Sequence, residues 1–317
     1  MELVEIAKQL FVTNVVLKED ERVLVVTDDE KFTIGMALYQ AAKDICAHVS
    51  LIVTPPAAVA GAEPDDCVTK AMERADVVLC PTAQSMTHTN ASLQAAALGA
   101  RVVTMPGITE EMFCRGAMTA DYSRVEKLST NLAHRLSQAN WAKLVTNDLE
   151  LHICLEGRSG VASTGVFRCP GSRGNLPSGE AYIAPQEGRS WGRVRVDGSM
   201  VGIGQLKSPL EFTVQDGVLQ EIRGVDKDKL EILMQRPENG NLCELGIGTN
   251  SGAQLCGLIL EDEKIYGTVH VAFGTNISFG GVTKADCHLD GVITCPDLWL
   301  DDEQVICKGA FLINLED

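Results

Sequence analysis

Residues 21–28 read ERVLVVTD, an apolar and β-branched run that is bounded by charged residues. Such a run is typical of a strand that is buried on both faces of a parallel sheet. Residues 32–46 then have the pattern of a helix, and further apolar runs alternate with helical segments along the chain. Strands that alternate with helices predict a parallel sheet with helices on both faces. The further runs are HVSLIVT (48–54), DVVLCPT (76–82) and RVVTMPG (101–107).

The segments between these runs are helical in pattern and carry no nucleotide-binding loop. Helices are expected over residues 63–75, 91–98 and 121–143, and the acidic start of the first of these suits the positive end of a helix. After the first strand the sequence continues as VVTDDEK, without a G-x-G-x-x-G or Walker-type loop. The first half therefore predicts an α/β domain of Rossmann-like topology over residues 1–146 that lacks the usual cradle for nucleotide phosphates.

From about Asn147 onward the pattern changes to short strands and glycine-rich turns. Period-two alternation and β-branched residues predict antiparallel strands, and DG and GG pairs predict turns between them. One helix is expected near residues 227–236. The second half is thus predicted to be a β-rich α+β domain over residues 147–317, so that the whole chain is of the α/β class. Its strand-like segments include LELHICLEG (149–157), WGRVRVDGSM (191–200), LEFTVQDGVLQEI (210–222) and DEKIYGTVHVAFG (262–274).

The composition excludes several kinds of partner. The 317 residues carry 43 acidic and 27 basic side chains, a formal net charge of −16, and such a surface repels phosphate backbones, so no nucleic-acid partner is expected. No apolar run is long enough to cross a bilayer, so no membrane partner is expected either. The first residues, MELVEIAKQLFVTNVVL, have the pattern of an amphipathic helix and not of a signal peptide, which favours a cytoplasmic location.

The cysteines do not form a recognisable framework. Their number is 11, which is odd, they are scattered along the chain, and no C-x-x-C pair occurs. In a chain of this length without a signal peptide, reduced and mostly buried thiols are expected. Cys243 and Cys287 each stand directly before a candidate metal ligand, and on a strand they are expected to face away from it.

Polar residues in apolar or glycine-rich surroundings point to a site in the second half. His288 and Asp290 stand two apart in DCHLDG, so on a strand both side chains leave the same face. His270 lies within the apolar segment GTVHVAFG; the alternative for it is a buried histidine bonded to a backbone carbonyl. Glu244 lies in NLCELGIGTN, where an unpaired buried carboxylate would be costly. Glu180 follows a turn in NLPSGEAYIAP, and its alternative is an exposed turn acid.

Together these residues supply two histidines and three carboxylates. A set of nitrogen and oxygen donors without thiolate suits Zn²⁺, Mn²⁺, Co²⁺ or Fe(II) better than a structural zinc site, which favours cysteine. The sequence therefore predicts a divalent-metal site of one or two ions, with His270, His288, Asp290, Glu244 and Glu180 as the candidate ligands.

Four stretches in this half also carry a family resemblance. In order and spacing they are similar to motifs of the aminopeptidase T-like metallopeptidase family, which includes a related branch with 2,5-dihydroxypyridine 5,6-dioxygenase. Residues 85–109 of the first half, SMTHTNASLQAAALGARVVTMPGIT, resemble the family more loosely. The four stretches are NLPSGEAYIAP (175–185), CELGIGTN (243–250), DEKIYGTVHVAFG (262–274) and CHLDGVI (287–293).

The resemblance implies one of two metal sites. In the peptidases the matching positions form a two-metal site, which here implies all five candidate ligands. In the dioxygenase branch an H-x-D pair and a further histidine hold a single Fe(II), which implies His270, His288 and Asp290 as that triad. The resemblance also implies a homodimer.

Three functions follow from these observations. The leading hypothesis is a metal-dependent hydrolase of the aminopeptidase type, which would attack a small amide or peptide-like substrate with metal-activated water and use Glu180 or Glu244 as the general base. The alternative is a mononuclear non-heme Fe(II) ring-cleaving dioxygenase, in which the two glutamates would handle substrate protons. The third possibility is a relative that binds a metal or ligand without catalysis. In each case the partner is a small molecule or a short peptide.

His88 is a further candidate catalytic residue in the first half. It lies in the polar cluster that follows the strand DVVLCPT, and in a parallel sheet the loops after the strands commonly face the ligand. The functional hypothesis is that His88 or a neighbouring hydroxyl closes over the substrate. The alternative is a helix cap, because T-H-T-N directly precedes a helical segment.

Overall fold

A computed structural model describes residues 2–313, whose contacts divide the chain into two units. The first unit contains the residues up to Ser123 together with Gly165–Ser178. The second contains Arg124–Thr164 and the residues from Gly179 onward. Among the residues described, no helix is both long and apolar enough to span a membrane.

The first unit is built on the parallel sheet predicted from its sequence. The strand that opens the series, β1, lies within the sheet, and all four pairings between neighbouring strands are parallel. All six residues after its first are buried, as expected for a strand covered on both faces. The order of the strands is β2 (His48–Thr54), β1 (Arg22–Asp28), β3 (Val77–Thr82), β4 (Arg101–Pro106) and β8 (Arg173–Asn175).

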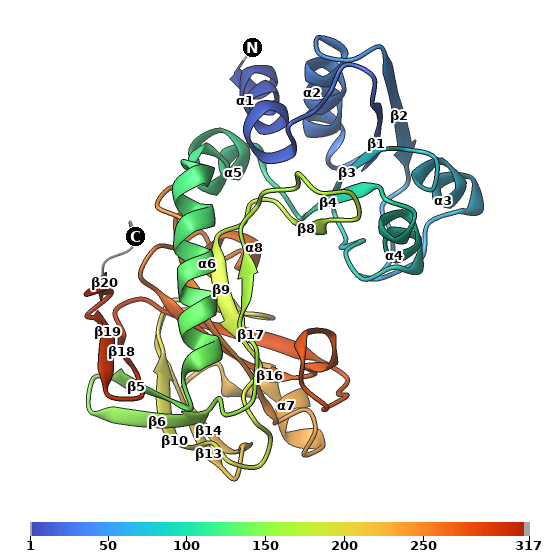
Figure 1. Cartoon of the computed structure of the whole chain (residues 1–317). Helices are drawn as coiled ribbons and strands as arrows, with labels where there is room; N and C mark the ends of the chain where they lie inside the picture. Colours follow the sequence, from blue (N-terminus) through green and yellow to red (C-terminus); the bar gives the residue numbers. More distant parts are fainter. Residues whose placement is uncertain (1, 314–317) are drawn as a thin grey trace. The chain divides into compact units, whose positions relative to one another are not determined.

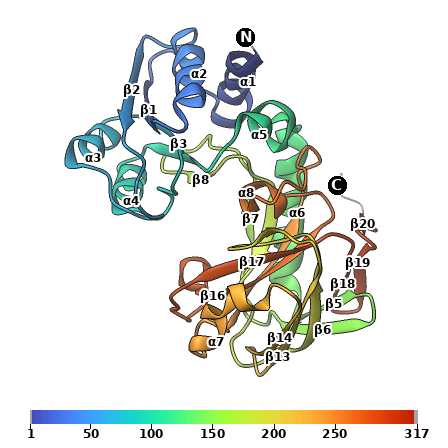
Figure 2. The same cartoon turned by 180° about the vertical axis from the view of Figure 1, so that it is seen from behind.

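Helices cover both faces of this sheet. Figures 1 and 2 show α1 and α2 on one side of β1 and β2, and α3 on the other. Helices α3 and α4 place Val68, Met72 and Ala95 in one apolar cluster with β1 residues such as Val26. The hydrophobic effect of this burial holds the two helices on the sheet. The helices are α1 (Glu2–Leu10), α2 (Phe32–Lys43), α3 (Asp66–Met72), α4 (Asn90–Ala97) and α5 (Glu110–Arg115).

The second unit contains two largely antiparallel sheets that share one apolar core. The sheet that bears the candidate site has the order β12-β11-β17-β16-β15-β9-β7, and the other has the order β14-β13-β10-β6-β5-β18-β19-β20. The strands of the first are β7 (Val161–Ser163), β9 (Glu180–Ile183), β11 (Ser199–Met200), β12 (Gly204–Gln205), β15 (Leu242–Gly248), β16 (Val269–Gly274) and β17 (His288–Ile293). Those of the second are β5 (Trp141–Thr146), β6 (Leu149–Cys154), β10 (Trp191–Val196), β13 (Leu210–Gln215), β14 (Val218–Arg223), β18 (Asp297–Leu300), β19 (Glu303–Cys307) and β20 (Ala310–Phe311).

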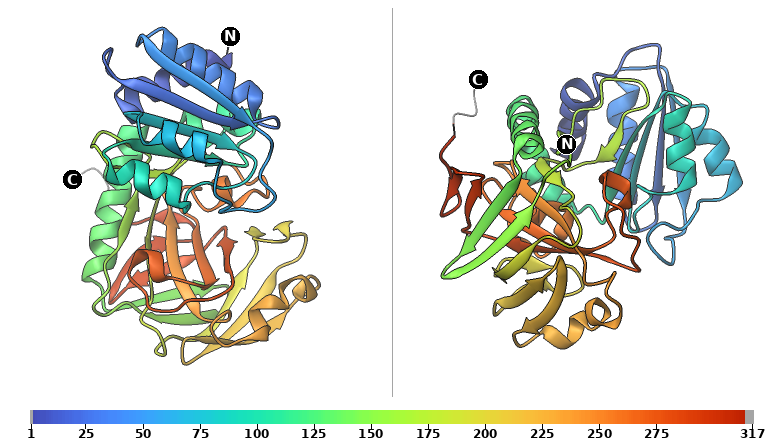
Figure 3. Two further views of the ribbon diagram at one scale, coloured as in Figure 1. Left: turned by 90° about the vertical axis from the view of Figure 1, so that its right-hand side faces the viewer. Right: turned by 60° about the horizontal axis from the view of Figure 1, so that its bottom comes forward.

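Helix α6 (Tyr122–Gln138) supplies further apolar residues to this core. It is drawn in green in Figures 1 and 3, alongside the strands of the second unit. Leu128, Leu132 and Leu136 are buried on one face of the helix, at the spacing of helical turns. The α/β class predicted for the chain, with a parallel-sheet part followed by a β-rich part, is confirmed.

The boundaries differ from the sequence-based ones in two places. The sequence predicts a helix to residue 143, but α6 ends at Gln138 and β5 begins at Trp141. The residues of β5 are alternately more and less buried, as in a strand. The predicted change of domain after residue 146 also differs from the observed division, which falls after Ser123 and returns Gly165–Ser178 to the first unit. In that segment β8 extends the parallel sheet by pairing with β4.

Three predicted segments of the second unit can be compared with the structure. The DG pair closes the hairpin of β13 and β14, because Asp216 and Gly217 both have positive φ, as a tight two-residue hairpin turn requires. The segment 262–274, expected to be one strand, is not continuous: α8 (Ile259–Asp262) ends in it and only β16 is a strand. The helix expected near residues 227–236 consists of a 3-10 turn (Lys227–Leu230) and the short α7 (Ile232–Gln235).

Candidate metal centre

The candidate ligands come from four neighbouring strands, β9, β15, β16 and β17. In the register of the sheet, Glu244 lies beside Ala272, and Ala272 lies beside Asp290. His270 lies beside Gly246, two residues along each strand, and therefore on the same face. The residues that alternate with them, such as Leu245 and Val271, belong to the apolar core. One face of this sheet thus serves the core and the other collects the polar groups.

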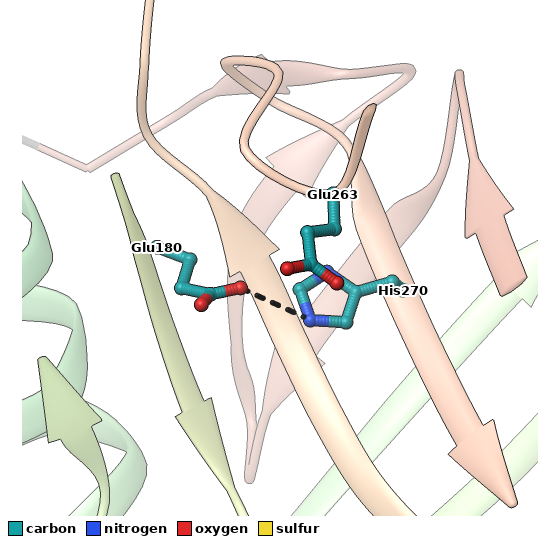
Figure 4. A group of neighbouring side chains, drawn as sticks. All are labelled: Glu180, Glu263 and His270. Atoms are coloured by element: carbon teal, nitrogen blue, oxygen red, sulfur yellow. Dashed lines mark ion pairs between the residues drawn. The ribbon is translucent and has the colours of Figure 1, made fainter. Parts of the chain in front are cut away.

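His270 is fully buried at the centre of these groups. Its Nε2 lies 3.3 Å from Glu180 Oε2 and 3.4 Å from Glu244 Oε1. Among the residues that the structure describes, neither nitrogen of the ring has a hydrogen-bond partner, and Glu180 Oε2 has none either. Figure 4 shows Glu180, Glu263 and His270 converging from separate segments. Because buried polar atoms normally form hydrogen bonds, the lack of such bonds at these atoms fits a bound cation as their partner.

The position of His270 depends on a glycine in the neighbouring strand. A Cβ placed on Gly246 would lie 2.0 Å from His270 Nε2, so the imidazole occupies the space that any other side chain at residue 246 would need. The backbone of Gly246 does not have positive φ, so the glycine is required by this close approach and not by its conformation.

His288 joins the group through Glu244 and Asp290. Its Nε2 lies 3.3 Å from Glu244 Oε2 and 3.4 Å from Asp290 Oδ1. On the other side of the ring, Nδ1 lies 2.9 Å from the carbonyl oxygen of Thr275. A proton on Nδ1 that is donated to this carbonyl leaves the Nε2 lone pair free, which is the usual arrangement of a metal-binding histidine.

Cys243 also contacts His288, whereas a regular strand predicts that its side chain faces away from the ligands. The pairing of β15 with β16 shifts register between Leu242 and Glu244, so Cys243 is the extra residue of a bulge, and a bulge redirects side chains. Its Sγ lies 3.5 Å from Nδ1 of His288, the nitrogen that faces away from the carboxylates. Burial raises the pKa of Cys243 to about 11, so the thiol stays protonated.

Donor atoms gather in two groups that share His270. One contains Glu244, His270 and Asp290, and the other contains Glu180, Glu263 and His270. Glu263 was missed in the sequence, because its segment was expected to be a strand in which Glu263 carried no distinct signal. Lys264 was missed as well: its Nζ lies 2.7 Å from Glu180 Oε1 and also pairs with Glu263.

The electrostatics of the cluster favour a positive charge among the carboxylates. Burial alone would raise the pKa of Glu244, but His270 and His288 lower it to about 2. Burial alone would lower the pKa of His270, but Glu244 and Glu180 raise it to about 9. The pKa of His288 is likewise raised, by Asp290 above all, against the effect of burial. A divalent cation would supply the positive charge that protons on these histidines otherwise provide.

The structure therefore brings five of the six predicted residues together, and the sixth, His88, belongs to the other unit. Glu180, Glu244, His270, His288 and Asp290 lie in one cluster, although their role as metal ligands stays a prediction. His88 belongs to the first unit, where it is exposed. Thr89, next to it, caps α4 by accepting a hydrogen bond from the Ser92 amide, so the helix cap considered as the alternative is present. A catalytic role for His88 stays a prediction.

A comparison with protein families covers almost the whole chain. The family model described as 2,5-dihydroxypyridine 5,6-dioxygenase (NicX) matches residues 2–313. The chain belongs to this family. A curated member, the 2,5-dihydroxypyridine 5,6-dioxygenase of Pseudomonas putida KT2440, is 23% identical over an alignment of 261 residues; the match covers 76% of this chain and 72% of the relative. The expected divalent-metal cofactor agrees with this dioxygenase family and with the clustered donor atoms.

Two solved structures share the fold of this dioxygenase-family chain. The 2,5-dihydroxypyridine dioxygenase of Pseudomonas putida KT2440 superposes with a TM-score of 0.82 at 19% identity, covering 98% of this chain and 97% of its own. AmpT from Thermus thermophilus superposes with a TM-score of 0.73 at 15% identity, covering 98% and 99%. The predicted resemblance to the aminopeptidases is therefore one of fold, whereas the dioxygenase branch is the family itself. The ranking of the hydrolase above the dioxygenase is corrected accordingly.

Proposed function

We propose that this chain is a mononuclear non-heme Fe(II) dioxygenase that opens the ring of a hydroxylated pyridine. The observation that carries the proposal is the donor set: His270, His288 and Asp290 lie within one cluster of a chain that belongs to a dioxygenase family. Two histidines and one carboxylate, with coordination positions left open, are the ligand set that oxygen-activating Fe(II) enzymes use. When bound, the iron supplies the activation of dioxygen next to the ring.

The two further carboxylates are placed to orient ligands and to move protons. Glu244 lies between the two histidines and contacts Nε2 of each, so it fixes the direction in which both rings point. Glu180 contacts Lys264 through Oε1, while its Oε2 is buried and has no hydrogen-bond partner in the described part of the chain. We assign to Glu180 Oε2 the acceptance of a proton from a ring hydroxyl of the substrate.

Aromatic side chains beside His288 suit a flat substrate. The ring of Phe279 lies edge-on to His288 at 6.0 Å between centroids and edge-on to Tyr182 at 5.4 Å. Phe279 belongs to a short 3-10 turn (Ile277–Phe279) whose loop is tied down by Glu187, which accepts hydrogen bonds from the Asn276 side chain and the Val282 amide. Such a wall excludes water and offers a π-face to an aromatic ring.

The test of the function is oxygen consumption. The purified chain, loaded anaerobically with Fe(II), is expected to consume dioxygen when 2,5-dihydroxypyridine is added and to bleach the absorbance of the ring. Chain loaded with Zn²⁺ is the control, since zinc has no redox chemistry. Hydrolysis of short peptides with no oxygen uptake would refute the proposal and restore the aminopeptidase hypothesis.

The substitution Glu180→Gln distinguishes a role of this glutamate as a proton acceptor from a role as a metal ligand. Because Gln keeps an acceptor for Lys264 but cannot take up a proton, the variant is expected to hold the same amount of iron and to lose roughly 10²-fold in kcat. Iron is counted by elemental analysis and kcat by oxygen uptake, with the exposed Glu221→Gln as the matched control. Loss of the iron in Glu180→Gln would instead make Glu180 a metal ligand.

Other expectations from the sequence stay predictions of this proposal. They are the cytoplasmic location, the homodimer, and the absence of nucleic-acid and membrane partners. The small-molecule substrate is consistent with the family to which the chain belongs.

A further inference from the structure

We propose that Lys264 is a built-in cation that takes the place of a second metal ion and thereby limits the site to a single ion. The inference rests on the proposed function, because it presupposes that the other donor group binds a metal. It concerns the group of Glu180, Glu263 and His270, which has the donor atoms for an ion of its own.

The ammonium group of Lys264 lies within this second group. The side chain is only 2% exposed, its Nζ is 2.7 Å from Glu180 Oε1, and it also pairs with Glu263. The backbone fixes its position, because its amide donates to the Glu261 carbonyl and its carbonyl accepts from the Asn250 amide. A buried charge is stable only when it is paired, and the two glutamates supply that pairing to the ammonium group.

Both donor groups share His270, so the ammonium group of Lys264 determines which of the two binds the ion. The Nε2 atom faces Glu180 of one group and Glu244 of the other, and one nitrogen lone pair binds one ion. In the group of Glu180 and Glu263 the carboxylates already have a cationic partner. In the group of Glu244 and Asp290 the partners are His270 and His288. Unlike an ammonium group, a neutral histidine can itself bind the metal. An ion is therefore expected to bind beside Glu244 and Asp290.

Charge explains why removal of Lys264 would admit a second ion. Glu180 and Glu263 bring two carboxylates into a buried position, and buried charges are stable only when they are paired. Without Lys264 this pairing is lost, and a divalent ion can restore it with the carboxylates and Nδ1 of His270 as donors, because Nε2 already binds the first ion. Lysine, a strongly hydrated point charge on a flexible stem, fits such a place without the geometric demands of a metal.

The experiment counts Mn²⁺, which is stable in air and binds the same oxygen and nitrogen donors as Fe(II). After equilibrium dialysis against excess Mn²⁺, elemental analysis is expected to find one ion per wild-type chain and two per chain of Lys264→Met. Lys264→Arg retains the charge and is expected to bind one. The exposed Lys207→Met serves as the matched control and is also expected to bind one. Thermal unfolding should show Lys264→Met gaining more stability from Mn²⁺ than the wild type does.

Each other outcome decides against a specific claim. Two ions in the wild type, or a single ion in a folded Lys264→Met, would overturn the role of Lys264 while leaving the iron site intact. A Lys264→Met chain that stays unfolded even in millimolar Mn²⁺ would overturn it too, since no ion could then replace the ammonium. No ion in the wild type would instead remove the metal centre and with it the proposed function.

Discussion

Replacing His288 by alanine is expected to abolish iron binding and oxygen uptake together. The change removes the Nε2 atom that contacts Glu244 and Asp290, and it leaves these buried carboxylates with fewer cationic or metal partners. Loss of an outer partner of a metal site costs ~10–100-fold in affinity, so loss of a direct ligand is expected to cost more than this. Iron content and oxygen uptake are measured on the same anaerobically loaded preparation.

An exposed histidine provides the control for this experiment. His134→Ala removes an exposed histidine of α6 and is expected to leave both measurements unchanged. Full iron content in His288→Ala would exclude His288 from the metal site. Weaker iron binding with no change in turnover would favour the third hypothesis, a relative that binds metal without catalysis.

His288 also shows what could be predicted from the sequence. Its two-residue spacing from Asp290 places both on one face of any strand, and the structure has the strand β17 there. Glu244 and His270 stood out because a charge or an imidazole in an apolar strand needs a partner. These signals depend only on neighbouring residues and on the period of a strand, and both survive in the folded chain.

Lys264 and Glu263 could not be found in the same way. In the sequence they are two charges in EDEK, a pattern that usually marks a solvated surface, and they fall in the strand predicted over residues 262–274. In the structure they follow α8 in a turn, and long-range contacts with Asn250 and Glu180 hold Lys264 in a buried position. Contacts between residues distant in the chain leave no periodic pattern in the sequence from which they could be predicted. The bulge at Cys243 was missed for the same reason, since it depends on pairing with β16.

The division into two compact units differs from the predicted boundary after residue 146 because it depends on contacts between residues distant in sequence. The three residues of β8 are too few to show a period, and they join the parallel sheet only by pairing with β4, about seventy residues earlier in the chain. The choice between hydrolase and dioxygenase was open for a similar reason. Both chemistries use the same histidines and Asp290, so the motifs alone could not separate them, whereas the family match over residues 2–313 could.

A methyl group added at Gly246 is expected to displace His270 and to empty the metal site. In Gly246→Ala the new Cβ would lie 2.0 Å from His270 Nε2 and 2.2 Å from Cε1, well inside van der Waals contact. The imidazole is fully buried, so it cannot move aside without disturbing its neighbours, and overpacking of this kind costs about 1–3 kcal/mol. We expect loss of iron and of oxygen uptake, together with a lower free energy of unfolding.

A second substitution identifies the cause of this loss. Gly174→Ala is the control, because Gly174 also lies in a strand without positive φ, but its nearest contact is 3.2 Å, to a Phe167 ring atom. His270→Ala removes the atoms that a Cβ at residue 246 would strike. If the clash is the cause, the two changes are not additive, and Gly246→Ala costs little stability in the His270→Ala background. Chemical denaturation of the wild type, the two single variants at Gly246 and His270, and the double variant measures this coupling. An equal cost in both backgrounds would show that Gly246 serves the backbone of β15 and not the position of His270.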